Sequence, residues 1–377
     1  MSLSTPFLEL DLDVVADRYA RLAASLPGTA IHYAVKANPH PEVLETLAAL
    51  GSGFDVASPA EVAAATAAGA PAGELLYSHP VKRRDDVAWA HAAGVRLFVV
   101  DSPDEVGKVA QAAPGASVLC RLLTSGEGSD WPLSRKYGAP PDACVRMLRD
   151  AAQQGLDPAG VAFHVGSQQR DPGAWAAPIH AGAAIFGRLE RAGLRPWLVD
   201  LGGGFPADHE GGHRPLEDYG RAIVREVRAA FGSRQPQTLV EPGRGLVGDA
   251  GALVAQVVAV VRRGERRWVY LDAGVFTGLV ETLDEAIRYR IETSADGAPT
   301  GPAVLAGPTC DSADVLYEHR PVELPLTLAE GDIVRFLAAG AYTSCYSTVG
   351  FNGFAPLPTV VGSAGRAVST RRRDAVA

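Results

Sequence analysis

From about residue 12 to residue 250, short apolar runs alternate with stretches in which apolar residues recur at helical spacing. The expected strands are 31–35, 53–56, 75–78, 96–100, 118–122, 160–164, 197–200 and 238–241. The main expected helices are 14–26, 41–50, 59–68, 83–93, 103–113, 142–154, 175–192 and 216–231. Repeated βα units form a parallel sheet, and eight of them predict a (β/α)8 barrel of the TIM type over residues 12–250. A doubly wound sheet is the alternative, but it needs no eighth strand.

The pattern changes after residue 250, where long amphipathic helices become scarce. Apolar runs separated by turns containing Pro and Gly read as strands at 253–261, 268–271, 303–305 and 333–336. The opening segment Thr5–Asp11 also has the character of a strand. We therefore expect a second, mostly β domain formed by residues 1–11 together with 251–377, with a frayed tail from residue 366.

Composition excludes several classes of function. A net charge of −8 provides no electrostatic footprint for nucleic acid or an anionic membrane. No apolar run approaches the roughly 20 residues that a membrane span requires. The four cysteines are scattered without metal-ligand spacing, and the N-terminus lacks a signal-like core. These features predict a cytoplasmic protein with reduced thiols and no bound metal.

Lysine is scarce in this chain, since only four of the 35 basic residues are lysines: Lys36, Lys82, Lys108 and Lys136. Arginine cannot replace a nucleophilic amine, so a lysine in an apolar setting draws attention. Lys36 ends the first expected barrel strand, at the edge where barrel enzymes build their active sites. Burial there favours the neutral, nucleophilic amine, whereas a lysine that extends to solvent is the plainer interpretation.

Two loops after the seventh and eighth expected strands have features of a phosphate site. Gly202-Gly-Gly-Phe-Pro allows close backbone approach to a ligand, and Arg244 in Glu241-Pro-Gly-Arg adds a guanidinium. Phosphates bind at these two loops in many such barrels. Glu241 ends its strand, where it is suited to pair with a protonated ring nitrogen, although a salt bridge to an arginine is the alternative.

Other polar residues also end strands. His164 could stack on a planar ligand, or it could be a hydrogen-bonded core histidine. Ser167 follows it and could bind phosphate. Asp55 ends the second strand; it could cap the next helix, although Ser58 suits that role better.

Taken together, eight segments occur in an order that resembles one family, the fold-type III pyridoxal-phosphate-dependent decarboxylases. They are Tyr33-Ala-Val-Lys-Ala-Asn, Gly53-Phe-Asp-Val-Ala-Ser, His164-Val-Gly-Ser, Gly202-Gly-Gly-Phe-Pro, Glu241-Pro-Gly-Arg, Cys310-Asp, Gly340-Ala-Tyr-Thr and Phe351-Asn-Gly-Phe. The resemblance runs from about residue 5 to residue 360. Within the family, Tyr77-Ser-His-Pro-Val-Lys is more similar to the ornithine branch than to the diaminopimelate branch.

The resemblance implies a pyridoxal 5'-phosphate site. Lys36 would carry the cofactor covalently, Glu241 would pair with the ring nitrogen, and His164 would stack on the ring. Asp55 and Arg121 are expected near the cofactor. The implied phosphate ligands are Ser167, Gly203, Gly204, Gly243, Arg244 and Tyr342.

The resemblance also implies a substrate site shared across a homodimer. Cys310 matches the residue that returns a proton after decarboxylation, and Asp311 matches the carboxylate that holds the substrate's distal ammonium. Both would enter the partner subunit's site, and Lys136 would pair with Asp314 across the interface.

Two departures from the family pattern concern the substrate pocket. A Tyr-Asp pair of the family falls on Asp284-Glu285 here, so Glu285 is the expected second acid and Asp284 competes with it. The segment between Tyr342 and Phe351 is one residue longer than in animal members of the family. Phe351 lines the pocket in the family, so the longer segment could shift it.

The expected reaction is decarboxylation of a basic amino acid, with L-ornithine converted to putrescine and CO2. Lysine, diaminopimelate or a related amino-acid derivative remains open as the substrate, although an acidic pocket would repel a second carboxylate. An amino-acid racemase and an inactive binding homologue are less consistent with the cofactor set and with Cys310-Asp311. Arginine is disfavoured because arginine decarboxylases of this type usually have longer chains.

Overall fold

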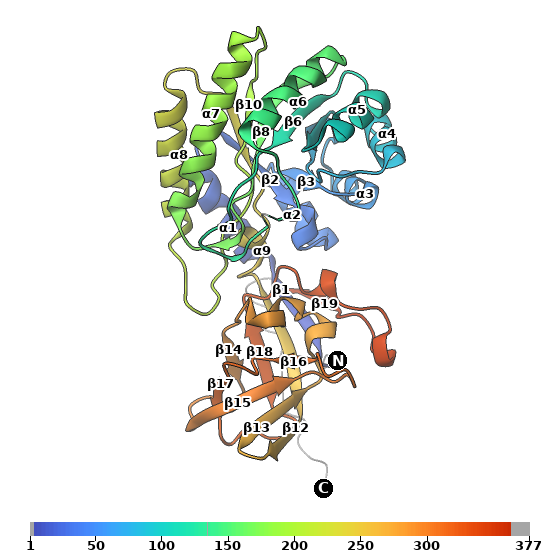
Figure 1. Ribbon diagram of the computed structural model, residues 1–377. Coiled ribbons are helices and arrows are strands. Elements are labelled where there is room, and N and C mark those ends of the chain that lie inside the picture. The colour runs from blue at the N-terminus through green and yellow to red at the C-terminus, as the bar shows by residue number, and fades with distance from the viewer. Residues whose placement is uncertain (1–3, 134, 363–377) are drawn as a thin grey trace. The chain divides into compact units, whose positions relative to one another are not determined.

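The computed structural model describes residues 4–133 and 135–362, which form two compact units. The barrel unit comprises Ala16–Pro206 and His213–Leu246. The sheet unit joins the chain up to Val15, the short segment Ala207–Gly212 and the chain from Val247 onward. Figure 1 shows the helices gathered in the first unit and the long strands gathered in the second.

Within these described ranges, eight parallel strands close the barrel in the order β10-β11-β2-β3-β4-β5-β6-β8. In chain order they are β2 (Thr29–Ala34), β3 (Gly53–Val56), β4 (Leu75–Tyr77), β5 (Leu97–Val100), β6 (Ser117–Arg121), β8 (Asp157–Ala162), β10 (Leu198–Asp200) and β11 (Gln237–Val240). The predicted (β/α)8 barrel is confirmed, and the doubly wound alternative is wrong because β11 pairs with β2 and closes the sheet.

Helices separate the strands, and several begin where their sequence dictates. They are α1 (Leu12–Ser25), α2 (Pro41–Ala49), α3 (Pro59–Ala67), α4 (Arg84–Ala92), α5 (Pro103–Ala112), α6 (Pro141–Gln153), α7 (Ala176–Arg191), α8 (Leu216–Phe231) and the short α9 (Arg244–Val247). Proline opens α2, α3, α5 and α6, where the missing N–H costs no helical hydrogen bond. Ser58 and Ser102 cap α3 and α5 by accepting from backbone N–H groups 3.2 and 3.3 Å away.

The interior of the barrel is a packed core and not a pore. Apolar side chains from neighbouring strands meet there, namely Leu76, Val99, Leu119, Ala159, Ala162, Leu198 and Leu239. Each is almost fully buried. This packing holds the strand ends in fixed positions, which is what a site assembled from several strands requires.

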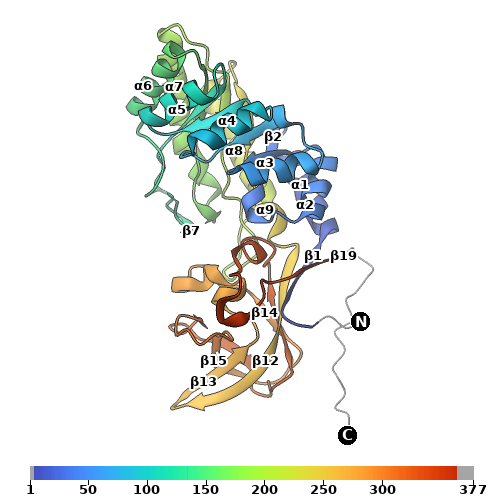
Figure 2. The ribbon, with the colours of Figure 1, turned by 90° about the vertical axis from the view of Figure 1, so that its right-hand side faces the viewer.

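The sheet unit is built mainly from antiparallel strands. They are β1 (Phe7–Asp11), β12 (Gly251–Arg263), β13 (Arg266–Leu271), β14 (Ile291–Thr293), β15 (Thr300–Ala306), β16 (Val315–Leu316), β17 (Val322–Pro325), β18 (Ile333–Leu337) and β19 (Thr359–Gly362). Long strand β12 runs beside β13 (Figure 2), and β1 pairs with β12 and β19. The predicted pairing of the N-terminal strand with the β domain is therefore confirmed.

Several details departed from the sequence prediction. The apolar pattern gave no sign of a small sheet between β7 (Ser129–Trp131) and β9 (Ser167–Gln169). Strand β8 begins and ends earlier than expected, so His164 follows the strand instead of belonging to it. No helix among the described residues is long and apolar enough to cross a membrane. The predicted fraying from residue 366 lies outside the described residues.

A buried lysine network holds helix α5 and the segment before α4 against β5. Lys82 Nζ lies 3.0 Å from Glu105 Oε1 and donates to the carbonyl of Val99 at 2.6 Å. The other Glu105 oxygen accepts from Lys108 Nζ at 2.5 Å. Burial lowers the pKa of Lys82 to about 8, although the adjacent Glu105 carboxylate opposes this shift. The amine of Lys82 therefore has a structural role, since Glu105 and the Val99 carbonyl both contact it.

Replacing Glu105 by Gln should destabilise the protein by about 3 kcal/mol, because the Lys82 ammonium then lacks its neighbouring counter-charge. Urea unfolding followed by circular dichroism measures the change. Glu74→Gln, a control at an exposed position, should alter the free energy of unfolding by less than about 0.5 kcal/mol. Equal unfolding midpoints for the two variants would contradict a role for the ion pair.

Candidate active site

The candidate site lies at the carboxyl ends of the barrel strands. Lys36 lies in the single turn η1 (Val35–Ala37) directly after β2, and Asp55 lies in β3. Ser78 follows β4 directly, and Glu241 follows β11. Because all strands of the barrel are parallel, these residues meet at one rim.

Lys36 and Asp55 form an ion pair at this rim. Lys36 Nζ donates to Asp55 Oδ2, and the Ser78 hydroxyl donates to Asp55 Oδ1. Asp55 is 1 % exposed, whereas the Lys36 side chain retains contact with solvent. The helix-cap interpretation of Asp55 is wrong, since Ser58 caps α3. Asp55 instead orients the amine of Lys36.

His164 lies between the rim and the glycine loop. Its Nδ1 accepts from the Gly166 N–H at 3.0 Å, so the ring proton is on Nε2. Burial, followed by the charges of Arg121 and Lys36, lowers the pKa of His164 well below its ordinary value. The imidazole is therefore neutral at neutral pH. A flat neutral ring is suited to pack against a planar ligand.

The glycine loop fits tightly between strand ends. Gly202 has φ +67°, and a Cβ there would lie 1.9 Å from the Phe163 carbonyl oxygen. A Cβ on Gly203 would lie 2.5 Å from the Glu241 carbonyl oxygen and 3.0 Å from His164 Nε2. Larger residues are thus excluded at both positions, and the loop brings its backbone close to the other site residues.

Arg244 and Ser167 converge beside this loop. Arg244 Nη2 lies 3.2 Å from Ser167 Oγ, and Nε lies 3.4 Å from the same atom. The guanidinium is almost fully buried. Its planar donors and the hydroxyl match the geometry in which proteins hold phosphate oxygens.

Glu241 is 8 % exposed, and its buried Oε1 has no hydrogen-bond partner among the described residues. Burial and the Asp55 carboxylate raise its pKa to about 7, although Lys36 and Arg121 oppose the shift. A buried acceptor without a donor suits a ligand that carries an N–H group.

Sequence reasoning missed two residues of the site, the carboxylate of Asp200 and the Ser78 hydroxyl that donates to Asp55. Asp200 is the last residue of β10 and is 1 % exposed. Its Oδ1 accepts from the Gly202 N–H at 2.8 Å, whereas its Oδ2 has no partner among the described residues. Their positions in the sequence could have identified them, because Ser78 and Asp200 each end an expected strand.

The sheet unit brings Cys310 and the Phe351 segment together. The backbone N–H of Cys310 donates to Asn352 Oδ1 at 3.1 Å, and the Cys310 side chain is exposed. Asp311 is also exposed. The Phe351 ring lies 4.9 Å from the Phe276 ring. Tyr342, another expected phosphate ligand, also belongs to this unit and has φ +56°.

Asp314 does not match its expected role as an ion-pair partner at a subunit interface. It is 2 % exposed, and its carboxylate accepts from the Val275 N–H at 2.7 Å and from the Thr309 N–H and hydroxyl at 3.0 and 2.8 Å. The buried side chain therefore organises its own loop, and the expected pairing with Lys136 needs correction.

Glu285 and Asp284 have different environments. Glu285 accepts from the His319 N–H at 2.8 Å and from Arg320 Nε at 3.0 Å, and Arg288 Nη1 lies 3.1 Å away. Burial raises the pKa of Glu285, but these donors outweigh burial and lower it. Asp284 is exposed and has φ +53°. Two arginines thus already neutralise Glu285, and Asp284 does not share this network.

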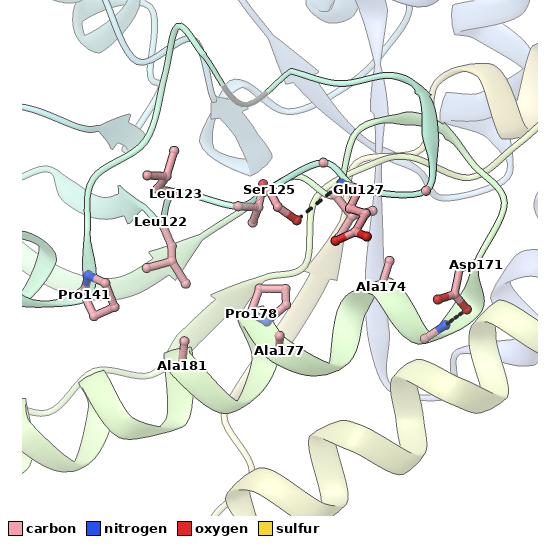
Figure 3. Close-up of a pocket in the computed structure, with 15 residues that line it drawn as sticks. Leu122, Leu123, Ser125, Glu127, Pro141, Asp171, Ala174, Ala177, Pro178 and Ala181 are labelled. Atoms are coloured by element: carbon pink, nitrogen blue, oxygen red, sulfur yellow. Dashed lines mark hydrogen bonds between the residues drawn. The ribbon is translucent and has the colours of Figure 1, made fainter.

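A cavity of about 550 Å³ lies between the 122–128 loop and the first turns of α7. Figure 3 shows Glu127 and Asp171 at one end and Leu122 and Pro141 at the other. None of the expected site residues lines it, so it is not part of the candidate site. Across the described residues, no group of three or more His, Cys, Asp or Glu side chains could hold a metal ion.

Comparisons with known proteins agree with this geometry. The family model for the pyridoxal-binding domain of pyridoxal-dependent decarboxylases matches residues 12–248. The lysine/ornithine decarboxylase of Selenomonas ruminantium is 36 % identical over 363 residues, covering 95 % of this chain and 90 % of that protein. The chloroplastic ornithine decarboxylase of Nicotiana glutinosa is 32 % identical over 362 residues, covering 93 % and 82 %.

A solved structure extends the similarity to the whole fold. The lysine/ornithine decarboxylase of Vibrio vulnificus, crystallised with cadaverine, has a TM-score of 0.86 at 33 % identity. The alignment covers 95 % of this chain and 94 % of that one. Because the family model spans more than half of the chain and both domains have counterparts, the chain belongs to the pyridoxal-dependent decarboxylases.

Proposed function

We propose that this protein decarboxylates a basic amino acid with a free distal ammonium, L-ornithine first and L-lysine second, with pyridoxal 5'-phosphate bound at Lys36. The observation that carries the proposal is the rim itself. An amine held by a buried carboxylate lies on the same rim as a second buried carboxylate, Glu241, whose Oε1 lacks a donor. The relatives named for lysine and ornithine decarboxylation support the substrate class.

The barrel residues fit this cofactor. The lone Glu241 oxygen suits a protonated ring nitrogen, and the loop at Gly203 leaves no room for a side chain. Arg244 and Ser167, with backbone from Gly204 and Gly243, would hold the phosphate. When bound, pyridoxal phosphate supplies an electron sink for the electron pair left after loss of CO2.

Each side chain at the rim has a distinct task in this proposal. Asp55 orients the Lys36 amine, and Glu241 holds the positive charge at the ring nitrogen. The neutral imidazole of His164 packs on the ring without adding charge. Arg121 offsets the buried negative charge near Glu241. Together these residues bind and orient the reacting groups and exclude water.

The substrate's distal ammonium requires carboxylates that are not already neutralised. Asp311 and Asp284 are both exposed, whereas Glu285 contacts Arg288 and Arg320. We therefore assign the distal ammonium to Asp311 and Asp284, and we treat Glu285 as the anchor of its strained turn. An acidic pocket disfavours diaminopimelate, which carries a second carboxylate.

Cys310 is assigned to return a proton to the reacting carbon, and Phe351 to line the pocket. We propose that both reach the neighbouring subunit's barrel in a homodimer, as the family resemblance implies. The four cysteines are all free thiols, which supports the reducing cytoplasm as the compartment.

Borohydride reduction should attach the cofactor to Lys36, because Asp55 holds this amine at the rim. Peptide mapping by mass spectrometry identifies the labelled lysine, and Lys36→Arg should remove the label. Lys82 serves as an internal control because its amine is buried against Glu105. A label on Lys82, Lys108 or Lys136 would refute the assignment.

Asp284→Asn should raise KM for ornithine about tenfold or more, through loss of a charge-assisted hydrogen bond. Glu285→Gln is the matched variant. It should lower the stability of the protein while leaving KM for ornithine nearly unchanged. Steady-state CO2 release on ornithine, lysine and diaminopimelate measures KM, and thermal unfolding followed by circular dichroism measures stability. The reverse pattern would move the role to Glu285, and higher kcat/KM on diaminopimelate would reject the basic-amino-acid proposal.

Mixing inactive Lys36→Ala subunits with inactive Cys310→Ala subunits should restore roughly a quarter of wild-type activity. Random pairing makes about half of the dimers mixed, and each mixed dimer has one intact site. Each variant incubated alone is the control. If subunits exchange, as judged by native mass spectrometry, and no activity returns, each site is built within a single chain.

A further inference from the structure

We propose that Asp200 is a positioning residue that holds one proton and donates it to Glu241, so that Glu241 presents a single oriented negative charge to the cofactor ring nitrogen. The inference rests on the proposed assignment of Glu241 to that nitrogen. Neither the family segments in the sequence nor the residues they match include Asp200.

The two carboxyl groups lie together in a buried part of the barrel. Asp200 and Glu241 line one small cavity with Ser78, Arg121, Val99, Ala162 and Phe163. The two carboxyl groups are close enough to interact directly. Ionised carboxylates can only accept hydrogen bonds, so this contact requires a proton on one of them.

The remaining contacts indicate which oxygen carries the proton. Asp200 Oδ1 already accepts from the Gly202 N–H, a bond that favours an unprotonated oxygen. Asp200 Oδ2 and Glu241 Oε1 are fully buried oxygens of this pair for which the described residues provide no donor. A proton on Oδ2 gives Asp200 a donor for Glu241. One oxygen of Glu241 then accepts a hydrogen bond from Asp200, and the other can accept one from the ring nitrogen of the cofactor.

Charges around the pair favour this distribution. Burial and the Glu241 carboxylate raise the pKa of Asp200 well above its ordinary value, and Asp55 adds to the shift. Burial raises the pKa of Glu241, but the two nearby cations, Lys36 and Arg121, oppose that rise. The hydrogen bond from Asp200 also lowers the pKa of Glu241. Glu241 is therefore the first of the two to ionise.

Two neighbouring groups on the other strands already have hydrogen-bond partners of their own. The Ser78 hydroxyl donates to Asp55, and the neutral His164 ring accepts from Gly166 through Nδ1. Without the Asp200 proton, two adjacent buried carboxylates would both be charged, which is strongly unfavourable. With it, the pair carries one charge, matched to one ring N–H.

Two substitutions separate this role from simple packing. Asp200→Asn keeps an oxygen for Gly202 and supplies an amide N–H to Glu241, whereas Asp200→Leu has a similar size and no donor. The full-length protein is freed of cofactor and loaded with pyridoxamine 5'-phosphate labelled with nitrogen-15 in the ring. Infrared spectroscopy at pH 8 reports a protonated carboxyl group, and nitrogen-15 NMR reports the protonation of the ring.

The expected pattern is specific. The protonated-carboxyl band of the wild type should vanish in Asp200→Asn, while the ring nitrogen stays protonated and the affinity for pyridoxamine phosphate stays within about threefold. Asp200→Leu should lose ring protonation and weaken binding about tenfold or more. An unchanged carboxyl band in Asp200→Asn, or a protonated ring in Asp200→Leu, would overturn the inference.

Glu241→Gln distinguishes this failure from failure of the proposed function. If Glu241→Gln leaves the ring protonated and binding unchanged, the assignment of Glu241 is wrong, and the role of Asp200 fails with it. If Glu241→Gln removes ring protonation while Asp200→Leu does not, the assignment of Glu241 to the ring nitrogen stands. Only the positioning role of Asp200 is then refuted.

Discussion

Burial of like charges at one rim is the constraint on which the candidate site depends. Asp55, Asp200 and Glu241 are all buried, and three such carboxylates repel each other in a medium that screens charge poorly. They are tolerated because Lys36 and Arg121 supply positive charge close by and because the proposed proton on Asp200 removes one negative charge. The barrel places these five groups on different strands, so each is held by its own backbone.

Neighbouring strands cooperate in this arrangement. Lys36, Asp55 and Ser78 follow from β2, β3 and β4, which are adjacent in the barrel, and they form one chain of hydrogen bonds. Parallel pairing fixes the register between these strands. A shift of one residue would turn the polar group toward the opposite face of the sheet. The precision of the site therefore derives from the register of the sheet.

The sequence was sufficient to predict those features that depend on periodicity and on strand ends. Alternation of apolar runs with helical stretches predicted the barrel, since each parallel strand requires its own crossover helix. Glu241, Lys36 and Asp55 were found because they end strands. Asp200 ends a strand equally clearly, but a carboxylate before a glycine loop has many structural explanations.

Features that depend on tertiary partners were not predictable. Arg320 lies 35 residues from Glu285, and no local pattern indicates that its guanidinium would neutralise that acid. The same holds for Asp314, whose donors come from Val275 and Thr309. Ion pairing over such separations is decided by the folded loop, and sequence spacing contains little information about it.

The position of β1 in the sheet unit means that this strand can pair only late in the synthesis of the protein. Residues Phe7–Asp11 leave the ribosome before the other described strands, but their partners β12 and β19 lie at Gly251–Arg263 and Thr359–Gly362. All the barrel strands are translated before either partner. Strand β1 therefore stays without these partners until the whole barrel has been translated. Pairing over such a sequence distance is slow, and an unpaired strand edge is prone to aggregation. The charged residues Glu9 and Asp11 within β1 reduce that hazard during the delay.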